Sequence, residues 1–176
     1  MATGTLISLD EYLSTIYDPD CEFVDGELLE RNMGESDHSG IQGIIVAVLY
    51  NQRRQYGIYV FPALRVQVAA TRYRIPDITV TTQKVRGKIL REPPFLCIEI
   101  LSPEDRASRM QTKIEDYLSF GVQHVWIIDP DSRKGWSYTR QGKWESTEVL
   151  ATSNPRLTLS LKEIFDELSE AVGDFS

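Results

Sequence analysis

The segment Phe95-Leu96-Cys97-Ile98-Glu99-Ile100-Leu101 decides the fold. Every side chain in it except that of Glu99 is apolar, which is typical of a strand buried on both faces within a sheet. The next residues, Ser102-Pro103-Glu104-Asp105, have the pattern of a helix start, with a serine N-cap, a proline in the first position and acids in the first turn. A second apolar run follows at 122–129. A strand, a helix and a strand in this order predict a parallel β-α-β unit.

The remaining elements predict an α/β fold with a mixed central sheet, flanked by helices and extended by β-hairpins. Apolar spacing and turn residues are the evidence, for example Asp25-Gly26 at the centre of the first hairpin and Gly57 as a helix stop. Pro62 predicts a bend in its strand, and Ser8 is a candidate N-cap. The expected elements are a short helix after Ser8, a hairpin over 22–30, a helix over 39–56, strands over 58–68 and 74–82, a polar loop over 84–94, a hairpin over 135–148 and a helix over 161–172.

Length and composition predict one soluble domain over residues 1–176. The chain is 41% hydrophobic and 26% charged, as is ordinary for a globular protein. It contains no run near the ~18 apolar residues that a membrane span needs, so no membrane association is expected. No basic and apolar leader is present at the N-terminus, which predicts a cytoplasmic protein. Cys21 and Cys97 are then expected to be reduced thiols.

The charge distribution is uneven. A net charge of −7 argues against a general nucleic-acid coat protein, because such proteins usually carry a positive surplus. Between residues 53 and 91, however, nine lysines and arginines face a single acid, Asp77. This segment is either a local basic face or an ordinary solvated surface of strands and loops.

Two acids are candidates for a metal site. Burying Glu99 among apolar neighbours costs several kcal/mol unless the carboxylate is paired, protonated or bound to a cation. Asp77 stands at the entrance of the preceding predicted strand. On adjacent strands the two carboxylates, with the backbone carbonyl of Ile100, make an oxygen site that suits Mg²⁺. The alternatives are an ion pair between Glu99 and a buried arginine, and an Asp77 that only accepts hydrogen bonds from nearby backbone.

Lys113 is the third candidate. The helix that carries it follows the strand of Glu99, so its first turns return across the end of that strand. There the amine could orient the attacking water or help to deprotonate it, and could stabilise a pentavalent phosphate. The alternative is a surface lysine that lays its stem along apolar neighbours. No Walker loop, zinc-spaced Cys/His cluster or Gly-x-Ser-x-Gly motif is present, and phosphodiester hydrolysis is the chemistry that these residues favour.

These residues resemble a known family. The ordered set Pro76-Asp77, Glu99-Ile100-Leu101-Ser102-Pro103, Lys113, Tyr117, Gly121-Val122 and Trp126-Ile127-Ile128-Asp129-Pro130 is similar to that of the Uma2 (DUF820) nucleases, of the PD-(D/E)XK superfamily. The resemblance implies a restriction-endonuclease-like core and DNA cleavage that depends on Mg²⁺ or Mn²⁺. It assigns Asp77 and Glu99 as metal ligands. The superfamily's usual lysine, two residues after the glutamate, is replaced by Leu101, and the resemblance implies that Lys113 supplies the amine instead.

The resemblance also implies accessory groups, for which Glu27 in the first hairpin and His38 before the next helix are candidates. A homodimer is expected, because paired cuts in duplex DNA need two sites. Two other functions stay open: a non-catalytic DNA-binding or assembly module that retains the fold, and a phosphoesterase that acts on RNA or nucleotides. Trp136, Tyr138 and Trp144 could stack on bases, or could cover the sheet or a subunit interface.

Overall fold

The computed structural model describes residues 6–31, 35–103 and 107–172, and its centre is a six-stranded mixed sheet. The predicted β-α-β unit is confirmed: β7 (Leu96–Ile100) and β8 (His124–Asp129) are parallel, and α3 (Ala107–Phe120) connects them. The predicted helix start at Glu104 and Asp105 lies outside the described residues. The other neighbouring strands are antiparallel. The strand order is β10 (Gly142–Ser146), β9 (Lys134–Thr139), β8, β7, β6 (Ile78–Thr81) and β3 (Tyr59–Pro62).

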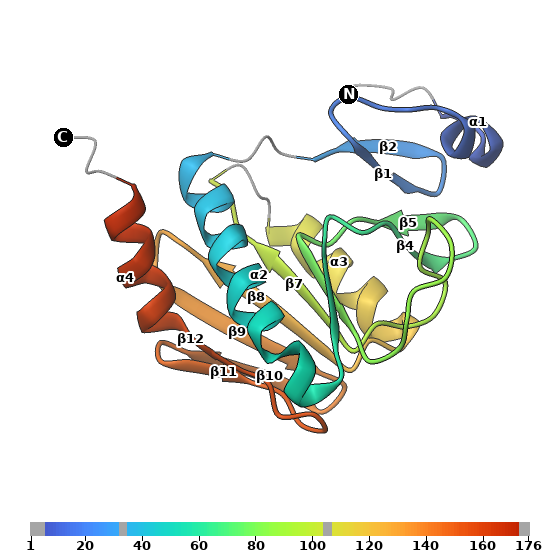
Figure 1. Ribbon diagram of the computed structural model, residues 1–176. Helices are drawn as coiled ribbons and strands as arrows, with labels where there is room; N and C mark the ends of the chain where they lie inside the picture. The colour runs from blue at the N-terminus through green and yellow to red at the C-terminus, as the bar shows by residue number, and fades with distance from the viewer. Residues whose placement is uncertain (1–5, 32–34, 104–106, 173–176) are drawn as a thin grey trace.

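Helices cover both faces of this sheet (Figure 1). On one face, α2 (Ser36–Tyr56) and α4 (Leu161–Ala171) pack together and close the larger hydrophobic core. Gly40 permits the close approach of the two helices, since a Cβ there would lie 2.7 Å from Leu168 Cδ1. On the opposite face, α3 packs against Cys97 and the alternate residues of β8. The side of β7 that carries Glu99 therefore faces α3, as the period of two along the strand predicts.

A second, four-stranded sheet lies beyond α3. Its core is a small aromatic cluster in which Tyr12 stacks on Phe23 and lies tilted against Tyr73. Val66 and Val68 of this sheet pack against α3. The helix is thus held between two sheets, and its polar residues can reach both of them. The strand order is β2 (Glu27–Glu30), β1 (Cys21–Val24), β5 (Arg72–Arg74) and β4 (Val66–Ala69), preceded by α1 (Leu9–Ser14).

Two predicted strands were wrong in extent, because each is divided between the two sheets. The segment 58–68 forms β3 in the central sheet and β4 in the second one. Between them the chain turns after Pro62, where Ala63 adopts a positive φ of 49°. The segment 74–82 is divided in the same way, with Arg74 ending β5 and Ile78 beginning β6. Pro76 lies at this second crossing, and it has no N–H to donate to either ladder.

Other predictions differ in smaller ways. The helix expected from Ser39 begins at Ser36, since α2 contains an additional turn at its start. A two-stranded sheet of β11 (Val149–Ala151) and β12 (Thr158–Ser160) was not predicted. The capping, turn and stop signals are confirmed: Ser8 Oγ accepts the Glu11 N–H at 3.1 Å, the Asp25-Gly26 turn has positive φ at both positions, and α2 ends at Gly57 with φ 64°.

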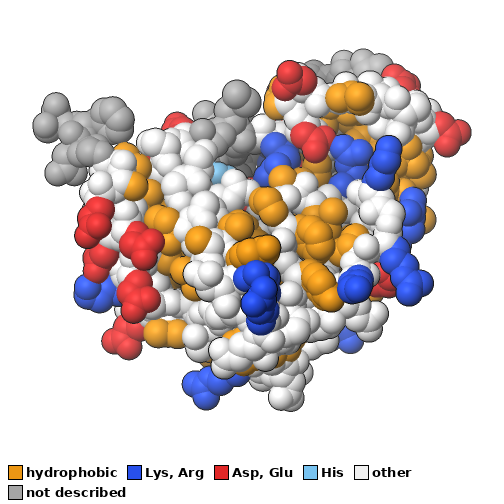
Figure 2. Space-filling model, viewed as in Figure 1, with side chains coloured by type: hydrophobic (Ala, Val, Ile, Leu, Met, Phe, Trp, Pro, Cys, Tyr) orange, Lys and Arg blue, Asp and Glu red, His pale blue; other side chains and the backbone are white. Residues whose placement is uncertain are grey.

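The surface is electrostatically divided (Figure 2). Acidic side chains gather along the edge formed by α4, whose exposed face carries Glu163, Asp166, Glu167 and Glu170. Lysine and arginine side chains gather on the other side, over the segment that contains β4, β5 and the loop after β6. Cys21 and Cys97 are buried free thiols. Within the described ranges, no helix has the length and apolar character that crossing a membrane requires.

Candidate active site

The register of β6 and β7 brings Asp77 and Glu99 together. Ile78 pairs with Ile98 in this antiparallel ladder, so one further step places Asp77 opposite Glu99. The Ile100 N–H donates to Asp77 Oδ2 at 2.8 Å and so fixes the aspartate against the end of β7. Both carboxylates are buried, with 5% of Asp77 and 3% of Glu99 exposed. Two acids that are remote in sequence therefore meet at the end of the two strands.

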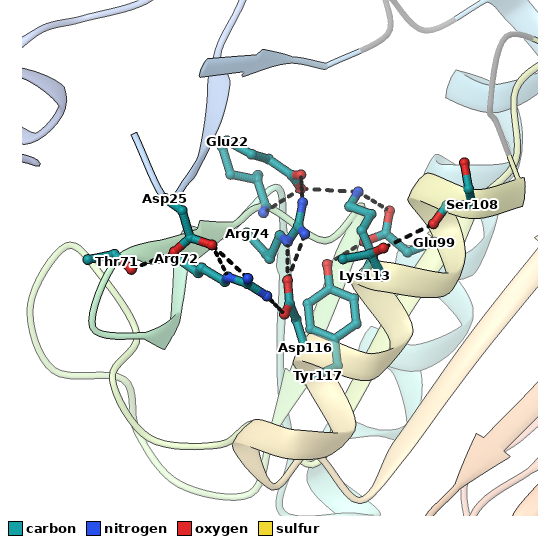
Figure 3. Close-up of polar contacts among 12 residues, drawn as sticks. Glu22, Asp25, Thr71, Arg72, Arg74, Glu99, Ser108, Lys113, Asp116 and Tyr117 are labelled. Atoms are coloured by element: carbon teal, nitrogen blue, oxygen red, sulfur yellow. Dashed lines mark hydrogen bonds and ion pairs between the residues drawn. The ribbon is translucent and has the colours of Figure 1, made fainter. Parts of the chain in front are cut away.

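Lys113 reaches the same place from α3. Its Nζ lies 3.0 Å from Glu99 Oε2, and the hydroxyl of Tyr117, one turn further along the helix, donates to Glu99 Oε1 at 2.5 Å. The partners of Glu99 are therefore Lys113 and Tyr117, and not the buried arginine that was the alternative to a metal site. Lys113 does not lie along the surface, since its amine points inward between acids (Figure 3).

The two members of this ion pair respond differently to burial. Burial raises the pKa of Glu99 to about 7, with further raising by the charges of Asp77 and Glu22, while the charge of Lys113 lowers it. Burial alone would lower the pKa of Lys113, but the nearby charges of Glu22, Glu99 and Asp77 outweigh it and raise that pKa. The amine is thus held as an ammonium. In this arrangement Lys113 is a hydrogen-bond donor and a positive charge, not a proton acceptor.

Asp77 has cationic neighbours of its own. Arg31 Nη2 lies 2.7 Å from Oδ1, and His38 Nε2 lies 3.2 Å from Oδ2. Although burial opposes the shift, the hydrogen bond and charge of His38 and the charge of Lys113 lower the pKa of Asp77. The hydrogen bond to Asp77 in turn raises the pKa of His38. Of the two accessory candidates, the structure thus brings His38 into the site, but it leaves Glu27 exposed on β2 and outside the cavity.

Glu22 is the hairpin acid that does reach the site, and the sequence analysis missed it. It is buried, with 4% exposed, and its Oε1 lies 3.1 Å from Lys113 Nζ. Its Oε2 accepts from Arg74 Nη1 at 2.9 Å. In the sequence, the signal that could have indicated an acid such as Glu22 was the pair Arg72 and Arg74, which flank Tyr73 on one short strand. Two arginines on one face of a strand, one of them buried, require acidic partners.

The site residues line a cavity of about 180 Å³, which has room for a small ion with water or for a phosphate group. Both acids and cations line it. Arg31 and Arg109 add positive charge to that of Lys113 on the walls. The polar and charged residues of the wall are Glu22, Glu30, Arg31, His38, Arg74, Asp77, Glu99, Ser102, Arg109, Thr112 and Lys113, and Ile100 also lines it.

The donor chemistry of this cavity fits a divalent cation that prefers oxygen ligands. In the ranges that the structure covers, no three acidic, histidine or cysteine side chains are grouped so as to hold a metal ion alone. The set available is smaller: the carboxylates of Asp77 and Glu99, and Ile100 at the end of β7. A cation such as Mg²⁺ usually takes one or two protein carboxylates and keeps several waters, so a set of this size suits it.

The mixed sheet with helices on both faces and an acid–lysine cavity at the end of two strands defines a restriction-endonuclease-like α/β protein. The family model that matches the chain, over residues 9–173, is Uma2, described as a "putative restriction endonuclease". The chain belongs to the Uma2 family. It is also similar to the crystal structure of a putative nuclease of DUF820 from Anabaena variabilis ATCC 29413. The two chains are 28% identical, with a TM-score of 0.81, and the match covers 92% of this chain and 99% of that one. No functionally curated protein matches the chain.

Proposed function

We propose that this protein is a divalent-metal-dependent endonuclease that hydrolyses phosphodiester bonds in DNA. The observation that supports it best is the convergence on one cavity of Asp77, which immediately precedes β6, with Glu99 from β7 and Lys113 from α3. Membership of the Uma2 family, and the similarity to a protein described as a putative nuclease, favour the same chemistry. DNA is the proposed substrate, and we propose a homodimer on the ground that two cuts need two sites.

Each residue has a distinct role in this proposal. Asp77 and Glu99, with the carbonyl of Ile100, would hold Mg²⁺ or Mn²⁺, which supplies a Lewis acid and lowers the pKa of a bound water. Lys113 holds a positive charge beside Glu99, where negative charge builds on the phosphate oxygens. Lys113 Nζ lies beside Glu99 and Glu22, where its ammonium would orient the attacking water and stabilise the charge on the phosphate.

Cations on the cavity wall support a phosphate substrate. Arg31 lines the cavity and contacts Asp77 through Nη2. Guanidinium groups bind phosphate oxygens through parallel hydrogen bonds, so a phosphate in the cavity could also contact Arg31. Arg109, on the first described turn of α3, lines the same cavity. These groups recognise phosphate rather than sugar, so RNA or a nucleotide is the second substrate class that the site could accept.

One observation favours a non-catalytic module. Both oxygens of Asp77 already accept hydrogen bonds within the protein, from Arg31 and from Ile100 and His38. Leu101 also replaces the lysine found at this place in the superfamily. A module of this kind would bind DNA without metal and without cutting it.

The test is nicking of a supercoiled plasmid by purified protein with Mg²⁺, with Mn²⁺ and with a chelator. We expect metal-dependent nicking that falls at least ~100-fold in the separate variants Asp77→Asn, Glu99→Gln and Lys113→Met, since charge-stabilising groups contribute about that much. Lys162→Met is the matched control, because Lys162 also pairs with an acid on a helix but is exposed and remote. Wild-type protein that never nicks DNA, yet shifts it on a gel equally with and without Asp77→Asn, would establish the non-catalytic module.

A further inference from the structure

We infer that Glu22 is a positioning residue for Lys113: it holds the amine in the cavity independently of Glu99. This inference rests on the proposed function, because it assigns to the second sheet a part in the same chemistry. Glu22 lies on β1, outside the central sheet that carries Asp77 and Glu99. Lys113 Nζ lies between the two glutamates, 3.1 Å from Glu22 Oε1 and 3.0 Å from Glu99 Oε2.

Glu22 is fixed from three directions (Figure 3). Its Oε1 accepts from the backbone N–H of Ile75 at 3.0 Å as well as contacting Lys113. Its Oε2 accepts from Arg74 Nη1 at 2.9 Å. Arg74 in turn contacts Asp116 on α3, with Nε at 2.8 Å and Nη2 at 2.6 Å from Oδ2. The carboxylate of Glu22 is therefore held in one orientation before it meets the lysine.

Helix α3 carries both Lys113, which contacts Glu22, and Asp116, which contacts Arg74. Asp116 follows Lys113 by three residues, so the two side chains lie on neighbouring positions of α3. Arg72 Nη1 holds the other oxygen of Asp116 at 2.7 Å and links it to Asp25 at the hairpin turn. The ion network thus fixes α3 against β1 and β5 at the turn from which Lys113 extends.

The arrangement matters because Glu99 has two tasks in the proposed reaction. A lysine side chain has a long flexible stem, and ordering it costs conformational entropy. A metal ion held by Glu99 would share the charge of this carboxylate and so weaken its hold on the ammonium of Lys113. Glu22 is not one of the proposed metal ligands and is fixed by Arg74 and the Ile75 N–H, so its contact with Lys113 would remain when Glu99 holds the ion.

The first experiment observes the amine directly and needs no activity. In a ¹H–¹⁵N spectrum of lysine ammonium groups, a slowly exchanging signal that is lost in Lys113→Met identifies Lys113. We expect Glu22→Gln to accelerate hydrogen exchange of this signal at least about tenfold, because the buried ion pair between Glu22 and Lys113 is lost. Glu22→Asp, which retains the charge, should recover part of the protection. Glu145→Gln is the matched control, since Glu145 pairs with Lys134 in the remote β9–β10 hairpin.

The second experiment measures cleavage. We expect Glu22→Gln to lower kcat about tenfold to 100-fold with KM for DNA within about twofold, and Glu22→Asp to restore part of the rate. In a Lys113→Met background, Glu22→Gln should lower the residual rate no further, because Glu22 acts through the lysine. Urea unfolding of each variant shows what fraction is folded under the assay conditions.

The outcomes separate this inference from the proposed function. An ammonium signal that exchanges within twofold of wild type in folded Glu22→Gln overturns the positioning role, whatever the nuclease result. So does a rate loss in Glu22→Gln that persists unchanged in the Lys113→Met background. A wild-type protein that never cleaves DNA overturns the proposed function, while accelerated exchange in Glu22→Gln would still establish that Glu22 holds the amine.

Discussion

Replacing Arg74 by methionine should destabilise the protein strongly. The guanidinium is buried, with 3% exposed, and it contacts both Glu22 and Asp116, which are buried as well. Removing it leaves Glu22 with Lys113 and the Ile75 N–H, and leaves Asp116 with Arg72. Breaking a buried ion pair from one side costs about 3–5 kcal/mol, because a charge stays buried without its partner. The remaining partners place the expected loss in the free energy of unfolding near ~3 kcal/mol, at the lower end of that range.

The assay is urea denaturation at pH 7 with tryptophan fluorescence and far-UV circular dichroism recorded on the same samples. Lys134→Met is the matched control, because Lys134 pairs with Glu145 in the β9–β10 hairpin and 40% and 49% of the two side chains are exposed. Exposed pairs contribute about 1 kcal/mol or less, so this variant should lose no more than that. A loss below ~1 kcal/mol in Arg74→Met, or an equal loss in the two variants, would refute the reasoning that burial makes this network structurally important.

Four further predictions follow from the site and the fold. Burial raises the pKa of Glu99 from 4.5 to about 7, so the contribution of Glu99 to stability is full below pH 4.5 and is lost as the pH rises to about 7. In urea unfolding without metal, the free energy of unfolding of wild type relative to Glu99→Gln should therefore fall between these pH values. A difference that does not change with pH would contradict this prediction. Calorimetric titration should show Mg²⁺ or Mn²⁺ binding to wild type that weakens at least ~10-fold in Asp77→Asn, and equal affinity would exclude Asp77 as a ligand. Gly57→Ala should lower the free energy of unfolding by about 1 kcal/mol, because Gly57 has a positive φ of 64°. Gly43→Ala, in open space within α2, should raise it by up to ~1 kcal/mol. Thermal melts that rank the two variants in the opposite order would contradict this prediction. Sedimentation velocity should show a dimer at micromolar concentration, and a monomer would contradict the proposed homodimer.

The parts of the fold that could be predicted are those with local signals. An apolar run interrupted only by Glu99 marks β7, and the apolar residues 125–128 mark β8. The Asp25-Gly26 turn and Gly57 have backbone conformations that few other residues adopt, so their places are readable from sequence. Asp77 and Glu99 could be paired in advance because acids at a strand entrance and within an apolar strand both need partners.

The parts that failed depend on contacts between distant segments. Nothing in the alternation of Leu64, Val66 and Val68 shows that β4 belongs to a different sheet from β3, since this pattern indicates only that β4 buries one face. Glu22 lies in a hairpin of ordinary appearance, and its partners are Arg74, 52 residues later, and Lys113 on α3. Leu150 and Leu159, which form the centres of two short strands, are separated by an irregular segment that gives no periodic signal.

The crossing between β5 and β6 makes the proposed centre depend on the assembly of both sheets. Within four residues the chain provides Arg74 to the ion network, the Ile75 N–H to Glu22, and Asp77 to the cavity. The first two need the hairpin of β1 to be docked, while Asp77 needs β7. A chain in which only one of the two sheets has assembled therefore lacks part of the proposed centre, and any nuclease activity would require both sheets to be in place.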